Sequence, residues 1–202
     1  MNAKAVFLDR DGVINELVYH AAHGIVGSPF TVEQFKLLPN VCEAITKFRT
    51  MGYKVILVSN QPDMSKGRIS RPTFEKIKQH MLSELTQSGA ALDAEYYCFH
   101  HPEATVDALK IDCECRKPKP GLLLRAAQDM GIDLHGSWMI GDGLTDIQAG
   151  KSAGCRTILI GRMKYELCSQ MDENDVSPDA VCAGLSQACD MIKVAATSRR
   201  ST

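Results

Sequence analysis

Several features that would place a chain in a familiar class are missing from this sequence of 202 residues. No run approaches the roughly 18 consecutive apolar residues of a membrane-spanning helix, so we expect no association with a membrane. Lysine and arginine together number 23, against 24 aspartate and glutamate residues, so the chain lacks the basic excess typical of nucleic-acid-binding proteins. It also lacks internal repeats and a domain linker. We therefore expect one domain over residues 1–202.

An export signal is also missing. Residues 1–4 pass directly into a short apolar segment, which leaves no room for a signal peptide. Eight cysteines are present, and in a secreted protein they would indicate disulfides. Without export, free thiols or metal ligation are the expected states. We expect a cytoplasmic protein, and we expect it to be a monomer.

The segment around which the chain is organised is residues 6–12, an apolar run that ends in Asp9, Arg10, Asp11 and a glycine. Such a run predicts a buried strand, and ligands of open parallel sheets bind beyond the carboxyl ends of strands. Two neighbouring carboxylates repel unless a cation or a shared proton compensates. Mg²⁺ is bound by one or two carboxylates together with substrate phosphate oxygens. The alternative for this segment alone is a strand followed by a solvated turn.

Strands and helices alternate along the rest of the chain. We expect strands at residues 5–8, 54–58, 95–99, 138–140 and 156–160, and helices at residues 40–51, 70–88, 122–130, 144–153 and 185–195. This alternation predicts an α/β fold, a Rossmann-like parallel sheet with helices on both faces. Residues 15–30, with several turn formers, predict an irregular flap. The pattern weakens beyond Gly161, so residues 162–202 are expected to form a C-terminal extension.

Polar groups follow two further strands and precede the third helix. Ser59 and Asn60 follow the second strand, and Asp142 follows the fourth. Together with Lys117 they predict phosphoryl transfer, because a carboxylate can attack phosphorus while a lysine and a hydroxyl or amide near Ser59 neutralise the phosphoryl oxygens. Asp142 would help to hold Mg²⁺, supported by Asp146 one helical turn later. Singly, each of these residues also fits an ordinary turn or surface position.

A second group of potential metal ligands lies in a loop at residues 98–115, here called the zinc loop. Its members are Cys98, His100, Cys113 and Cys115. One imidazole and three thiols suit a structural, tetrahedral Zn²⁺ that is closed to water. We expect His101 to lie outside the ligand set. The alternative is that these cysteines are separate buried thiols. We expect that state for the remaining cysteines: Cys42, Cys155, Cys168, Cys182 and Cys189.

These motifs resemble those of the haloacid dehalogenase superfamily of phosphatases. The matching residues are Asp9-x-Asp11-Gly12, Ser59-Asn60, Lys117-Pro118 and Gly141-Asp142-x-x-x-Asp146. The zinc loop and its continuation through Gly121 are similar to those of the heptose bisphosphate phosphatases and their histidinol-phosphate phosphatase relatives. The resemblance covers residues 5–161. It implies a fold without a large cap domain, whose site is walled by the loop after Asp11 and by the zinc loop.

The resemblance also implies a role for each matching residue. Asp9 would be the nucleophile and a Mg²⁺ ligand. Asp11 would be the general acid and base, and its backbone carbonyl a second ligand, with Asp142 as the third. Ser59 and Lys117 would stabilise the transferring phosphoryl group. The implied substrate contacts are Asn60, Gln61 and Arg116. The implied reaction is Mg²⁺-dependent hydrolysis of a small phosphate monoester through an aspartyl-phosphate, with a heptose 1,7-bisphosphate as the first candidate.

The sequence departs from the family pattern at several positions. These are Val13 where Thr is common, Pro62-Asp63-Met64 where the heptose enzymes have Ser-Gly-Ile, Gly143 where Lys is usual, and residues 17–20, which lack Asp-His-Gly. None removes a group that the core chemistry needs, but several lie where a sugar or second phosphate would be held. Histidinol phosphate is the alternative substrate, and a nucleic-acid 3′-phosphate a more distant one. A zinc-stabilised binding protein without activity is the alternative of another class.

Overall fold

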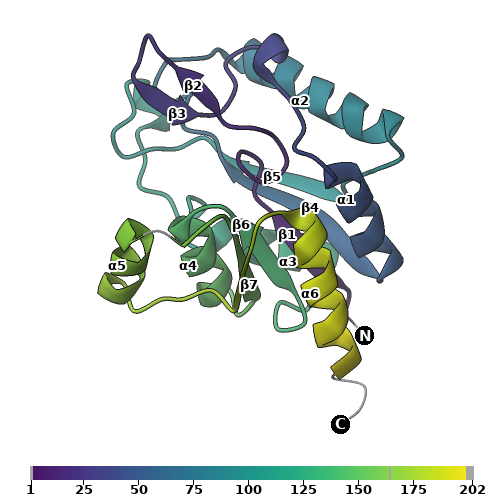
Figure 1. The fold of residues 1–202 in the computed structure, drawn as a ribbon. Coiled ribbons are helices and arrows are strands. Elements are labelled where there is room, and N and C mark those ends of the chain that lie inside the picture. The colour runs from purple at the N-terminus through teal and green to yellow at the C-terminus, as the bar shows by residue number, and fades with distance from the viewer. Residues whose placement is uncertain (1, 164, 199–202) are drawn as a thin grey trace.

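The computed structural model describes residues 2–163 and 165–198 and is built on one six-stranded parallel sheet (Figure 1). The strand order is β5-β4-β1-β6-β7-β8. The strands are β1 (Lys4–Leu8), β4 (Tyr53–Asn60), β5 (Ala94–Cys98), β6 (Trp138–Gly141), β7 (Arg156–Ile160) and β8 (Ala180–Cys182). From β1 the chain builds first toward β5 and then toward β8, so the order reverses at β1. Ligands of such sheets bind at this reversal.

Helices cover both faces of the sheet, as the sequence predicts. They are α1 (Val41–Thr50), α2 (Arg71–Gln87), α3 (Gly121–Met130), α4 (Leu144–Ser152), α5 (Tyr165–Glu173) and α6 (Leu185–Ser198). Residues of α1, α2 and α6 pack on one face, and residues of α3 and α4 on the other. In β1, Val6 and Leu8 belong to the first core and Ala5 and Phe7 to the second. This strand is apolar throughout because both of its faces are buried.

Two segments differ from the sequence-based expectation. Within residues 15–30, predicted to be irregular, β2 (Val18–His20) and β3 (Ile25–Gly27) form an antiparallel hairpin. Beyond Gly161, α5 and β8 appear where the pattern is weak, and β8 adds a sixth strand beside β7. Strands of three residues are too short to show a periodic pattern, so only their tertiary partners define them. Residues 164 and 199–202 of the predicted extension lie outside the described residues.

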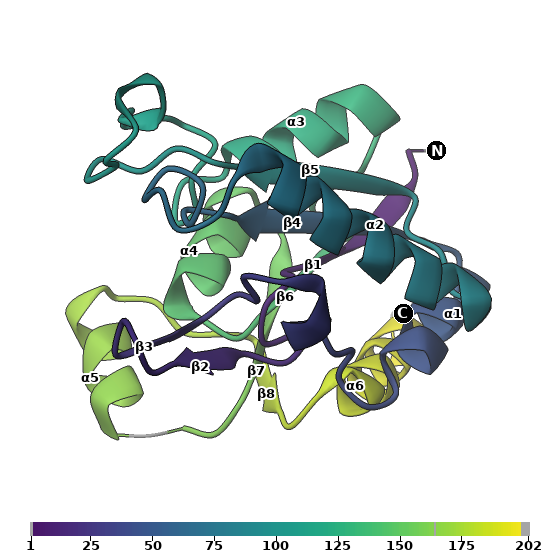
Figure 2. The ribbon, with the colours of Figure 1, turned by 90° about the horizontal axis from the view of Figure 1, so that it is seen from above.

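The hairpin and the zinc loop lie at the same end of the sheet, where the carboxyl ends of the strands point (Figure 2). Between β5 and α3 the described chain has one regular element, the short 3₁₀ helix η2 (Asp107–Leu109). A similar turn, η1 (Val32–Gln34), precedes α1. None of the helices in the described part of the chain has both the length and the apolar character needed to cross a bilayer.

Candidate active site

Three carboxylates meet at the carboxyl ends of β1 and β6. Asp9 follows β1, Asp142 follows β6, and Asp146 lies in the first turn of α4. One carboxylate oxygen of each lies within 4.8 Å of the others. The parallel pairing of the two strands causes this meeting, because Leu8 is in register with Ile140. The structure therefore brings together three of the four aspartates that the sequence motifs single out, and Asp11 is the fourth.

Two glycines make room for these carboxylates. Gly12 has φ +80°, and a Cβ atom there would lie 2.0 Å from the Oδ2 atom of Asp142. A Cβ atom on Gly141 would lie 2.1 Å from the Cβ atom of Asp146. Both distances are far inside van der Waals contact, so a side chain at either glycine would displace a carboxylate. The glycines of the two motifs thus serve the close approach of the acidic side chains.

Lys117 lies beneath this cluster and is 2% exposed. Its Nζ atom donates to the Val58 carbonyl at 2.9 Å and lies 2.9 Å from Asp9 Oδ1 and 2.5 Å from Asp146 Oδ1. Burial by itself lowers the pKa of Lys117, but the two carboxylates outweigh it and raise the pKa above its usual value. Asn60 exchanges two hydrogen bonds with the Lys117 backbone, at 2.9 and 3.1 Å. The Asn60 amide, predicted as a substrate contact, therefore holds Lys117 in place.

The carboxylates are poorly compensated in this position. Burial raises the pKa of Asp9 to about 6, and although Lys117 lowers it, Asp146 and Asp11 raise it further. Burial also raises the pKa of Asp142 to about 7, with Asp9 and Asp146 adding to the rise. The charged forms of Asp9 and Asp142 are destabilised by burial and by neighbouring carboxylates, and a bound cation would relieve this destabilisation.

The donor set fits Mg²⁺. Asp146 already directs one oxygen at Lys117 and accepts the Gly143 backbone N–H at 3.1 Å with the other. Asp9 and Asp142 are then the carboxylates available to a cation, in agreement with the one or two that Mg²⁺ usually takes. The Asp9 side chain is 15% exposed, whereas that of Lys117 is 1% exposed. Asp9 can therefore be reached by a substrate from outside.

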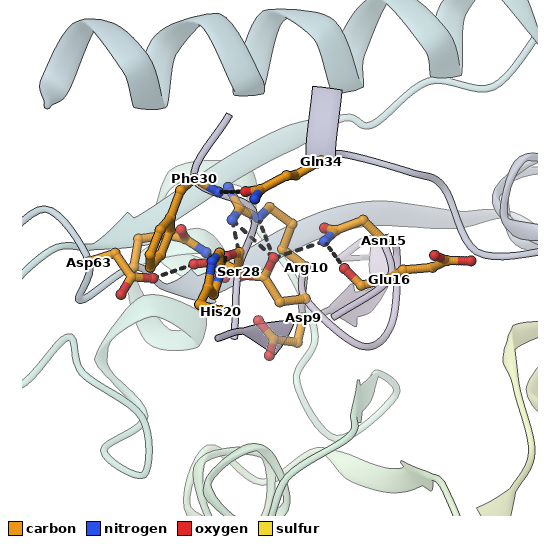
Figure 3. Close-up of polar contacts among 12 residues, drawn as sticks. Asp9, Arg10, Asn15, Glu16, His20, Ser28, Phe30, Gln34 and Asp63 are labelled. Carbon is orange, nitrogen blue, oxygen red and sulfur yellow. Dashed lines mark hydrogen bonds and ion pairs between the residues drawn. The ribbon is translucent and has the colours of Figure 1, made fainter. Parts of the chain in front are cut away.

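Asp11 is held by a clamp of three side chains. Arg10 donates from Nε and Nη2 at 3.0–3.1 Å, Asn15 from Nδ2 at 2.9 Å and Gln61 from Nε2 at 2.7 Å. Gln61 Nε2 also lies 3.0 Å from the Ser59 hydroxyl. Arg10 is only 1% exposed, and Figure 3 shows it beside Asn15. The sequence motifs predict no role for Arg10 or Asn15.

The zinc loop brings its four predicted ligands together. Cys98, Cys113 and Cys115 have Sγ atoms separated by 3.1–3.5 Å, and Nδ1 of His100 lies 3.9 Å from Cys98 and 3.4 Å from Cys115. Four donors bound tetrahedrally at the usual zinc distances would be about 3.5–3.8 Å apart, so this set fits Zn²⁺. His101 lies outside the cluster, and its Nδ1 accepts the Glu103 backbone N–H.

The zinc loop is also joined to neighbouring parts of the site. Arg116 donates from Nη1 to the His100 carbonyl at 3.3 Å, and the chain continues directly into Lys117. The Ser65 carbonyl, in the loop after β4, accepts backbone N–H groups of Thr105 and Val106. Of the other cysteines, Cys155, Cys182 and Cys189 are buried as expected, whereas Cys42 and Cys168 are only partly buried.

Comparison with known proteins agrees with this geometry. The chain is 40% identical over 158 residues to D-glycero-beta-D-manno-heptose-1,7-bisphosphate 7-phosphatase of Photorhabdus laumondii, covering 78% of this chain and 80% of that protein. The chain belongs to the haloacid dehalogenase-like phosphatases. The Vibrio cholerae protein of the same name is 38% identical over 170 residues, covering 84% and 87% of the two chains. The HAD-hydrolase-like family model matches residues 114–188 of this phosphatase.

Two solved structures extend the likeness over nearly the whole phosphatase. The D,D-heptose 1,7-bisphosphate phosphatase of B. bronchiseptica, complexed with magnesium and phosphate, superposes with a TM-score of 0.76 at 28% identity, covering 94% of this chain and 97% of that one. A putative HAD-like phosphatase from Mesorhizobium loti gives a TM-score of 0.77 at 26% identity, covering 96% and 87%. The family resemblance inferred from the motifs is thereby confirmed.

Proposed function

We propose that this phosphatase is Mg²⁺-dependent and removes the 7-phosphate from D-glycero-D-manno-heptose 1,7-bisphosphate, leaving the heptose 1-phosphate. One observation carries the proposal: the Asp9 carboxylate is partly exposed, forms an ion pair with Lys117 and lies close to the Asp142 carboxylate. The relatives from P. laumondii and V. cholerae are named for this reaction, which supports a sugar bisphosphate over histidinol phosphate. That the enzyme is a single-domain, cytoplasmic monomer stays a prediction.

Asp9 and Asp11 would divide the chemistry between them. An oxygen of Asp9 attacks phosphorus, the bond from phosphorus to the sugar oxygen breaks, and an aspartyl-phosphate forms. Asp11 gives a proton to the departing sugar oxygen. In the second step, Asp11 takes a proton from a water molecule as the water oxygen attacks phosphorus. Inorganic phosphate leaves, and the Asp9 carboxylate is restored.

The groups around Asp9 would favour the charge that develops during transfer. The positive charge of Lys117 lies 2.9 Å from the Asp9 oxygen, where little water screens it. The Ser59 hydroxyl, near the end of β4, and Arg116, directly after the zinc loop, would contact phosphoryl oxygens or the rest of the substrate. Fixed donors in a buried site stabilise such charge without reorganising.

Asp11 would have to release one donor before it can reach the leaving oxygen. Its hydrogen bonds from Asn15 and Gln61 come from neutral amides, whereas Arg10 binds it through a charged fork. Charge-assisted, bidentate bonds are the stronger kind. We therefore expect an amide to yield while Arg10 stays in contact with Asp11.

The two metals would have different roles. Mg²⁺ would be held by the carboxylates of Asp9 and Asp142 and by the backbone carbonyl of Asp11. When bound, it would offset the repulsion between the anionic nucleophile and the anionic phosphate. Zn²⁺, held by the cysteines and His100 of the zinc loop, would shape the loop that carries Arg116 and Lys117.

Phosphate release from a panel of phosphorylated sugars and histidinol phosphate, with and without Mg²⁺, tests the proposal. We expect Mg²⁺-dependent release that is fastest from the heptose 1,7-bisphosphate, with the 1-phosphate retained in the product. Faster release from histidinol phosphate would favour the alternative substrate. No release from any ester, with zinc and phosphate still bound, would favour a binding protein without activity.

A further inference from the structure

A buried hydrogen-bond network ties the β2–β3 hairpin to the loop that follows β4. Ser28, directly after β3, donates its hydroxyl to the Oδ2 atom of Asp63. Arg68 donates from Nη1 to the other oxygen of Asp63 at 2.8 Å. Ser28 and Asp63 are 6% and 5% exposed, and Figure 3 shows them facing each other. A buried carboxylate needs such partners, so this contact fixes the hairpin to the loop.

The hairpin side of the network is a small unit of its own. The Nε2 atom of His20 donates to the Ser28 carbonyl at 2.8 Å, and the His20 ring stacks on Phe30 with centroids 3.6 Å apart. On the hairpin surface, Tyr19 and Val26 are paired across the strands and are 67% and 62% exposed. An isolated two-stranded hairpin is marginally stable at best. This hairpin therefore needs tertiary contacts, and the Ser28–Asp63 hydrogen bond supplies one of them.

Both ends of the contact lead into the catalytic cluster. Asp63 lies two residues beyond Gln61, whose amide donates to Asp11 at 2.7 Å. On the other side, Glu16 at the start of the flap lines a groove of about 540 Å³ together with Asp142. Ser28 and Asp63 thus join the hairpin and the loop after β4 beside Arg10 and Asp9 (Figure 3), where these two segments would form adjacent walls around a substrate bound at Asp9.

We propose that Asp63 is a specificity-determining positioning residue, which fixes the hairpin through Ser28 and so sets the space for the part of the substrate that is not transferred. The inference rests on the proposed phosphatase function. A phosphorylated sugar with a second anionic group extends beyond the transferred phosphate and would lie against this wall.

Kinetics of Asp63→Ala and Ser28→Ala on two substrates test this role. One substrate is the best sugar phosphate of the panel above, and the other is p-nitrophenyl phosphate, whose non-transferred part is small. We expect the ratio of kcat/KM values, sugar phosphate over aryl phosphate, to fall about tenfold in either variant, mainly through KM of the sugar phosphate. The double variant should fall no further, because both substitutions remove the same contact.

Hydrogen exchange provides a second measurement that does not depend on activity. In both single variants we expect backbone amides of residues 18–27 to exchange faster than in the wild type. Asp63→Asn keeps an oxygen that can accept from Ser28 and should recover part of the substrate ratio. Arg68→Met removes the ion pair but leaves the hydroxyl contact, so its effect should be smaller. The matched control is Ser83→Ala, at an exposed serine of α2.

The outcomes separate this inference from the proposed function. Wild-type exchange of the hairpin amides in both variants would overturn the contact as the anchor of the hairpin. Faster exchange with an unchanged substrate ratio would overturn its role in specificity. If the wild type hydrolyses no ester, the proposed function fails, while the exchange result still reports on the contact. Ser28→Ala removes one hydroxyl only and carries the test if Asp63→Ala does not fold.

Discussion

The carboxylate cluster and the zinc loop differ in what holds their ligands in place. Asp9 and Asp142 follow central strands whose side chains are almost fully buried, and the Asp9 N–H donates to the Ile140 carbonyl at 3.0 Å. In the zinc loop, Cys98 ends a strand at the edge of the sheet, and of residues 99–116 only Ala104 is buried. Strand register places the first cluster, whereas little apolar packing supports the second.

The difference predicts separate functions for the two proposed metals. A site placed by the sheet keeps its geometry when its cation leaves, so the cation can take part in chemistry and exchange. A loop with few buried side chains depends on its metal for its shape, because metal binding supplies the folding free energy that packing does not. Loss of zinc should therefore act on catalysis indirectly, by misplacing Arg116 and Lys117. The predictions below test this contrast, beginning with the largest effect.

Asp9→Asn should lower turnover on the order of 10⁴-fold or more, as expected for loss of a nucleophile. The fold should persist, because strand register places residue 9 and the charged carboxylate is itself destabilised by burial. Turnover and the unfolding midpoint are the measurements. Asp129→Asn, at an exposed carboxylate of α3, is the control. A folded variant with near-normal Mg²⁺-dependent turnover would remove Asp9 as the nucleophile.

Asp11→Asn should slow both steps by roughly 10²–10⁴-fold, the usual contribution of general acid–base catalysis. The loss in the first step should be smaller with p-nitrophenyl phosphate, since its phenolate leaves readily without a proton, whereas hydrolysis of the shared aspartyl-phosphate should be slowed equally for both substrates. Single-turnover and steady-state rates on both substrates give the comparison. Asp11 would have no part in the mechanism if the variant kept wild-type turnover at saturating sugar phosphate.

His100→Ala should lower zinc content and activity together, with activity falling about 10²-fold because small displacements near the chemistry have effects of this size. His101→Ala is the matched control one residue away and should retain the metal. Metal analysis of the purified proteins, followed by hydrogen exchange over residues 98–116, measures both effects. Equal zinc in the His100 variant and the wild type would contradict the ligand set.

The smallest expected effect is a loss of stability on substitution of Asp179, which lies at the edge of the sheet away from the catalytic cluster. Asp179 accepts the Thr157 backbone N–H at 2.7 Å and the Lys151 ammonium at 2.8 Å, and so joins β7 to the chain entering β8. We expect Asp179→Ala to lower the free energy of unfolding by about 1 kcal/mol, because the side chain is partly exposed to solvent. Urea unfolding measures the change, and turnover should not fall. Asp172→Ala, at an exposed residue of α5, is the control.

The difference in the free energy of unfolding between the wild type and Asp179→Ala should also depend on pH. Although burial acts in the opposite direction, the hydrogen bonds from Lys151 and Thr157 lower the pKa of Asp179 in the folded protein. A lowered pKa contributes stability above the pKa of the unfolded carboxyl, about 4, and this contribution is lost as the pH falls through the folded value. Wild type and Asp179→Ala should therefore converge in stability in acid. A difference that persists unchanged there would contradict the assignment.

Sequence patterns predicted most of the central sheet because its strands are buried on both faces and read as apolar runs. They also predicted that Asp9, Asp142 and Asp146 would gather, because motifs at the ends of neighbouring parallel strands share one edge. They missed β8 and the β2–β3 hairpin, whose strands of three residues carry no periodic signal. They assigned no function to Arg10, since an arginine between two aspartates resembles a solvated charge.

The sequence by itself determined the parallel α/β sheet and the grouping of the aspartates and of the four zinc-loop side chains, because each depends on local spacing and on burial of apolar runs. Only the tertiary structure decided which side chains surround them. Gln61 reaches Asp11 across 50 positions of sequence to complete the contacts of Arg10 and Asn15, and Asp63 accepts from Ser28 across 35 positions. Local spacing cannot encode such contacts, because they form only when packing of the core brings distant loops to the same edge of the sheet.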